Sequence, residues 1–169
     1  MRILPYEDYQ LITSLPEKEV VELISQQIEP APALRSSQSK RATNRKPYEG
    51  EISGNIFKII RIIRYRNSFV PMIFGTIEKQ GAVTRIHVEM RIMPLATLFI
   101  AFLMGIILIM GISFLVIGLH DQRFLPALAV PLMMLAVGYF MVYWGFKSES
   151  AKSKKFLNEL LRADEVRAA

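Results

Sequence analysis

The sequence lacks cysteine altogether and contains only two histidines, His87 and His120. The absence of cysteine excludes disulfides, thiolate nucleophiles and metal sites with sulfur ligands. Neither histidine stands at a spacing from acidic residues that is typical of metal ligands. The sequence also lacks the phosphate-binding, dinucleotide-binding and nucleophile-elbow motifs. We therefore expect no catalytic residue, no cofactor and no metal, and the protein is predicted not to be an enzyme.

Charged residues are missing from two long stretches, 93–119 and 124–146. Each exceeds the roughly 20 apolar residues that a helix needs to cross a bilayer. Neither stretch has the polar face that a helix of a water-soluble protein usually keeps. The short connection between them allows only an antiparallel arrangement, so we predict a transmembrane helical hairpin. Pro131 predicts a kink in its second helix.

Lysine and arginine lie on one side of this hairpin. Arg85 and Arg91 precede it, Lys147 and three further lysines follow it, and the connection holds a single arginine beside an aspartate. The positive-inside rule then places both termini in the cytoplasm. We expect a multi-pass protein of the bacterial inner membrane without a cleaved signal peptide, because the N-terminus has no continuous apolar run. The predicted membrane-interface anchors are Tyr139, Tyr143, Trp144 and Lys147.

The chain before the hairpin divides into three parts. Residues 1–29 are predicted to form a strand and a helix, because apolar residues recur at helical spacing after Pro16. Residues 30–47 are rich in proline, serine and basic residues, which indicates a basic flexible loop. Residues 48–92 are predicted to form an antiparallel β-meander with strands at 48–53, 56–66, 70–78 and 83–92. The last strand alternates apolar and polar residues, as expected when one face is buried.

Residues 57–66 carry cations at every third position, at Lys58, Arg61 and Arg64. As a helix they would form the basic amphipathic face that is typical of membrane surfaces. We favour a strand, because isoleucine and aromatic residues dominate and a Gly54-Asn55 turn precedes them. Arg61 would then lie on the more apolar face and would have to reach an acid, a sheet edge or a headgroup. The acids available for it are Glu51, Glu78 and Glu89.

Residues 147–169 are predicted to form a cytoplasmic amphipathic helix that continues from the second transmembrane helix. Its apolar stripe includes Phe156, Leu157 and Leu161. Packing against the sheet is the favoured interpretation of this stripe. Self-association or binding of a partner is the alternative.

One pattern resembles a known group of proteins. It consists of Tyr65-Arg66-Asn67-Ser68-Phe69, then Pro71, Gly75, residues 84–88 and Met90, followed directly by the hairpin. This pattern resembles a group of small uncharacterised bacterial membrane proteins over roughly residues 48–146. The resemblance implies no activity and no functional residue. The arrangement is also weakly similar to bacterial PH-like membrane proteins, in which the order of the segments differs.

These observations predict a membrane α+β protein, with a small cytoplasmic antiparallel β-meander, flanking helices and a two-helix transmembrane hairpin. The expected function is a non-enzymatic, membrane-anchored interaction or accessory module. Its expected partners are membrane lipids, a second copy or another membrane protein, and no nucleic acid. The alternative is a homo-oligomeric channel or transport component lined by Thr97, Ser113, Tyr139 and Tyr143. The cations that would contact anionic headgroups are Lys58, Arg61, Arg64, Arg66, Arg85 and Arg91.

Overall fold

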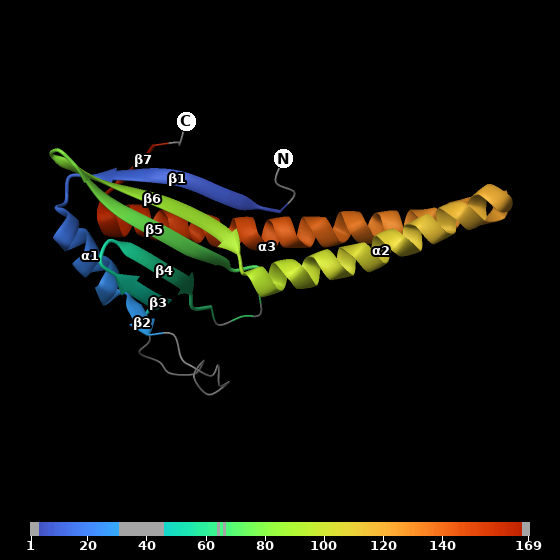
Figure 1. Ribbon diagram of the computed structural model, residues 1–169, viewed down its shortest axis with the longest axis horizontal. Helices are drawn as coiled ribbons and strands as arrows, with labels where there is room; N and C mark the ends of the chain where they lie inside the picture. The colour runs from blue at the N-terminus through green and yellow to red at the C-terminus, as the bar shows by residue number, and fades with distance from the viewer. Residues whose placement is uncertain (1–3, 31–45, 64, 66, 167–169) are drawn as a thin grey trace.

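A computed structural model describes residues 4–30, 46–63, 65 and 67–166. Within these residues the chain forms a seven-stranded sheet and three α-helices, two of them in a long hairpin (Figure 1). The predicted basic loop, 30–47, lies almost entirely outside the described residues. The elements are β1 (Tyr6–Thr13), α1 (Glu17–Gln26), β2 (Ile28–Pro30), β3 (Tyr48–Ser53), β4 (Ile56–Arg61), β5 (Pro71–Gln80), β6 (Val83–Ile92), α2 (Pro94–His120), the 3₁₀ segment η2 (Gln122–Leu128), α3 (Ala129–Leu161) and β7 (Asp164–Val166).

The sheet has the strand order β2-β3-β4-β5-β6-β1-β7. Strands β3 to β6 form the predicted meander, and β6 has the predicted bounds. The two-residue turns of the meander begin with Gly54 and Gly81, whose φ angles of 57° and 64° favour glycine. The sheet is mixed and not purely antiparallel, because β2 pairs with β3 in parallel. The expected N-terminal strand is β1, which joins the sheet beside β6.

The segment 57–66 is a strand only as far as Arg61. The last pair between β4 and β5 joins Ile60 to Met72. Pro71, the next residue of β5, has no N–H with which to continue the ladder. The strand interpretation was therefore right for β4, but the strand is shorter than predicted.

One face of the sheet is covered by α1 and by the second half of α3 (Figure 1). The core between them is formed by alternate residues of the strands and by apolar residues of the two helices. The predicted packing of the tail helix against the sheet is confirmed, since Leu157 and Leu161 are buried there. The opposite face, which we call the outer face, carries no helix among the described residues.

The sequence predicts a helix over the whole tail, 147–169, but the end of the tail is not helical. Helix α3 stops at Leu161, and Arg162 adopts a left-handed conformation with φ 46°. The Thr13 hydroxyl donates a hydrogen bond of 2.8 Å to the Leu161 carbonyl, which satisfies one free acceptor at the helix end. The chain then turns back, and β7 pairs with residues 10–12 of β1.

Helices α2 and α3 are long and apolar enough to cross a membrane. They run antiparallel beyond the sheet, and most of their large apolar side chains are exposed (Figure 1). Water-soluble monomers rarely expose apolar patches of this size. Pro131, predicted to kink the interior of the second helix, lies instead in the first turn of α3, which begins at Ala129, and a first helical turn does not need the missing N–H. The 3₁₀ segment η2 makes the connection instead.

Candidate functional site

The hairpin meets the sheet on α3, around Gly145, and Tyr65, Asn67 and Phe69 hold the two parts together. The Asn67 side-chain amide donates a 3.0 Å hydrogen bond to the Gly145 carbonyl, and its oxygen accepts one of 2.9 Å from the Phe69 N–H. A Cβ atom on Gly145 would lie 2.8 Å from the Phe69 ring. The absence of a side chain at Gly145 therefore lets Phe69 sit directly on the helix. We call the following set of residues the junction: Tyr65, Asn67, Phe69 and Gly145, with Glu149, Glu7 and their ion-pair partners described below.

One turn further along α3, the Glu149 side chain is completely buried, with 0% exposure. Its carboxylate accepts hydrogen bonds from Arg61 Nη1 at 2.7 Å and from Lys152 Nζ at 2.7 Å. The Tyr65 hydroxyl donates a third. Burial alone would raise the pKa of Glu149, but the three donors outweigh it and hold the pKa below its usual value. Glu149 is therefore a buried anion that ties Arg61 of β4 and Tyr65 to α3.

A second, largely buried carboxylate, Glu7 of β1, is 11% exposed and joins the other side of the sheet to the same helix. Lys147 Nζ lies 2.7 Å from Glu7 Oε1, and the Ser150 hydroxyl donates to the same oxygen at 2.9 Å. Burial would raise the pKa of Glu7, yet the donors and the nearby charges keep it below its ordinary value. Lys147, which we predicted to anchor the chain at the membrane interface, is therefore an ion-pair partner of β1.

Small residues bring α3 close to the sheet beside these ion pairs. Ser150 and Ser153 are both fully buried. The Tyr48 ring packs against Phe156 with centroids 5.0 Å apart, and Lys154 lies 4.4 Å from the centroid of Tyr9. Burial raises the pKa of both tyrosines, so their hydroxyls stay neutral.

The cations predicted to contact headgroups do not form one surface. Lys58, Arg85 and Arg91 lie on the outer face, where Lys58 and Arg91 flank the Phe74 ring. Arg61 lies on the opposite face and is paired with Glu149, so none of the three acids expected for it is its partner. Arg64 and Arg66 lie outside the described residues.

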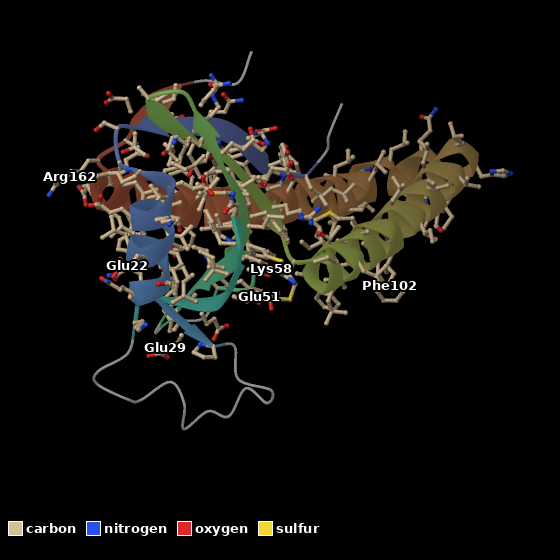
Figure 2. All side chains as sticks on the ribbon, turned by 60° about the vertical axis from the view of Figure 1, so that its left-hand side comes forward. Glu22, Glu29, Glu51, Lys58, Phe102 and Arg162 are labelled. Carbon is tan, nitrogen blue, oxygen red and sulfur yellow. The ribbon has the colours of Figure 1, made fainter. Side chains whose placement is uncertain are left out.

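Acids accompany these cations on the outer face. Glu51 is opposite Lys58 in the strand pairing, and Glu78 is opposite Arg85. Figure 2 shows Lys58 and Glu51 close together on the sheet, whereas Phe102 projects away from the body of the protein. The outer face is thus mixed in charge and is not a basic surface. Its described acids are Asp8, Glu29, Glu49, Glu51, Glu78, Glu89 and Asp164.

The predicted aromatic anchors lie at the end of the hairpin that meets the sheet. Tyr139 stacks on Tyr143 with centroids 6.3 Å apart, and Trp144 is 65% exposed. All three project from α3 within two turns of the junction.

Ser113 is one of the four residues predicted to line a pore. Its hydroxyl donates a hydrogen bond to the Ile109 carbonyl of its own helix.

The outer face also brings together a group that sequence spacing did not reveal. His87 Nε2 lies 3.4 Å from Asp8 Oδ1 and 3.7 Å from Glu89 Oε1. The ligand atoms of the three residues lie within 4.8 Å of one another. In the part of the chain that the structure describes, this is the single group of three such side chains with metal-ligand spacing.

No known protein family, curated protein or solved structure matches this chain. The resemblance carried by residues 65–69 therefore stays a prediction. What the structure adds is a physical role for that stretch, because Tyr65, Asn67 and Phe69 all contact α3 at the junction.

Proposed function

We propose that this chain is a non-enzymatic, membrane-anchored accessory module of the bacterial inner membrane. In this proposal the hairpin crosses the bilayer, and both termini and the sheet lie in the cytoplasm. The observation that carries the proposal is the continuity of α3, which runs without interruption from the apolar hairpin into the core of the sheet. The junction then fixes the sheet to the hairpin.

The outer face is the surface that this arrangement presents to a partner. Ile56 on this face is 58% exposed, beside the paired charges of Lys58 and Glu51. A partner protein with its own alternating charges fits such a surface better than a uniformly anionic lipid layer does. We therefore favour a membrane-associated protein as the partner, with lipid contacts confined to the hairpin and its aromatic residues.

Membrane topology is tested first, and the lack of native cysteine makes the experiment simple. Single cysteines at Gln122, in the connection, and at Lys155, on the second half of α3, are labelled with a maleimide that does not cross membranes. In intact spheroplasts we expect labelling at position 122 only. Labelling at position 155 only would reverse the orientation, and equal labelling at both would contradict a two-span hairpin.

Partner binding is tested with a photo-crosslinking amino acid at position 56 and, as the control, at position 122. The expected result is a discrete protein adduct from position 56 alone, together with a native particle heavier than the 19.3 kDa chain in mild detergent. A particle containing only this chain, with no protein adduct from position 56, would refute the accessory-module proposal.

A further inference from the structure

The pairing of β1 with β6 places two carboxylates face to face on the outer face. Asp8 and Glu89 are direct partners in the register, and His87 is the next residue of β6 on the same face. Like charges that are directly opposite destabilise a strand pair. Neither carboxylate has a lysine or arginine within ion-pair distance among the described residues. The arrangement thus carries two negative charges and a single imidazole, which a bound cation would neutralise.

Two of the three separations are close to those around a metal ion, and the third, between the Asp8 and Glu89 carboxylates, is no more than 4.8 Å. A tetrahedral ion with bonds of about 2.0–2.2 Å holds its ligand atoms about 3.3–3.6 Å apart. The distances from His87 Nε2 to the two carboxylates are 3.4 and 3.7 Å. An ion therefore fits between the three side chains with at most small rotamer changes.

A neighbouring residue already orients one of the carboxylates. The Tyr6 hydroxyl donates a 3.3 Å hydrogen bond to Asp8 Oδ2, and this leaves Oδ1 directed toward His87. Hydrogen bonds of this kind orient ligating carboxylates in protein metal sites. The three side chains are 35–38% exposed, so water can complete the coordination.

We propose that Asp8, His87 and Glu89 bind one divalent first-row transition-metal cation on the outer face. One imidazole with two carboxylates suits Zn²⁺ or Mn²⁺, whereas a Ca²⁺ site would be built from oxygen ligands alone. The site rests on two adjacent strands of the sheet, so the ligands are held by a rigid backbone. It does not depend on the proposed topology or partner.

The test uses the full chain in mild detergent, purified without a polyhistidine tag, and titrated with ZnCl₂ by calorimetry. We expect one zinc ion per chain. His87→Ala should lower the zinc affinity by about tenfold or more. His120→Ala is the matched control, because it removes the other histidine and should leave the affinity unchanged. Equal affinity of the two variants, or no binding at one equivalent by the unaltered chain, would overturn the proposal.

Two further variants separate metal binding from a purely structural role of the cluster. Glu89→Gln should weaken zinc binding, whereas Glu78→Gln on the neighbouring strand should not. Glu89→Lys supplies its own positive charge opposite Asp8, so it should abolish zinc binding while its unfolding midpoint stays at or above that of the unaltered chain. Zinc-edge absorption spectra should show one imidazole ligand. Spectra without an imidazole, or undiminished binding by Glu89→Lys, would refute the assignment.

Discussion

Replacing Glu149 with glutamine tests whether the junction holds the sheet on α3. The substitution keeps the shape of the side chain and removes its charge. Arg61 and Lys152 then lose the anion that they share. Tyr65 keeps an acceptor, so the perturbation is chiefly electrostatic.

The size of the effect follows from burial. Removing one partner of a fully buried ion pair costs about 3–5 kcal/mol. Here the cations are 30% and 49% exposed and can turn toward water, which lowers the cost. We expect a loss of about 2 kcal/mol, within the range for hydrogen bonds to charged groups. With a urea dependence of about 2 kcal/mol per molar, the unfolding midpoint should fall by about 1 M.

The assay is urea unfolding of the full chain in mild detergent, followed by circular dichroism and by fluorescence of Trp144, the single tryptophan. The control is Glu159→Gln, which removes an exposed partner of Lys155 at 3.8 Å. Such surface pairs contribute up to about 1 kcal/mol, and most contribute less. If Glu149→Gln shifts the midpoint no more than the control does, the junction does not stabilise the sheet.

Three further predictions concern the same unfolding midpoint. Gly145→Ala should lower the free energy of unfolding by about 1–3 kcal/mol, and with it the midpoint, because the added Cβ would meet the Phe69 ring at 2.8 Å. Gly105→Ala, with nothing within 4 Å of the new atom, should be neutral or stabilising, and equal effects would contradict this reasoning. The pKa of Glu149 is depressed in the folded chain, so its ionised carboxylate stabilises the fold at pH values above its ordinary pKa of 4.5. This stabilisation is lost as the pH falls through the lower folded pKa. Acidification below pH about 4.5 should therefore destabilise the unaltered chain more than Glu149→Gln, as seen in unfolding curves at several pH values. Arg162→Gly should raise stability by about 0.5 kcal/mol by relieving the left-handed conformation, and a decrease in the urea midpoint would show that this position is unstrained.

The sequence predicted the parts of the fold that local patterns encode. Alternation located β6, and the Gly54-Asn55 turn located the end of β3 and the start of β4. Strand β5, predicted over 70–78, instead runs over Pro71–Gln80. The long uncharged runs located the hairpin. The end of the tail helix could not be predicted in this way, because the apolar spacing of a helix continues past Leu161. Its end depends on Thr13 of a distant strand, which no local pattern records. A strand as short as β7 likewise leaves too few residues for alternation to be visible.

The junction was missed for a similar reason. Arg61 was correctly expected to need a partner, but Glu149 lies 88 residues away and could not be selected from the strands nearby. A usable signal was present, since Gly145, Glu149 and Ser153 recur at intervals of four on one face of α3. Small and acidic residues on the buried side of a helix indicate close contact with another element. The Asp8, His87 and Glu89 group depends on the pairing of β1 with β6, which alternation within each strand does not specify.

Because α3 is continuous, the direction in which the sheet faces relative to the hairpin depends on the number of residues in the helix between them. At 1.5 Å per residue, its 33 residues form a rod of about 50 Å, clamped by the sheet at one end. Each residue added between Trp144 and Glu149 would turn the sheet by about 100° around that rod relative to the hairpin. If the hairpin is fixed in a bilayer, the length of this helix decides whether the outer face looks along the membrane or away from it. Insertions of one residue and of seven at this point should therefore differ sharply, because seven residues nearly restore the original azimuth.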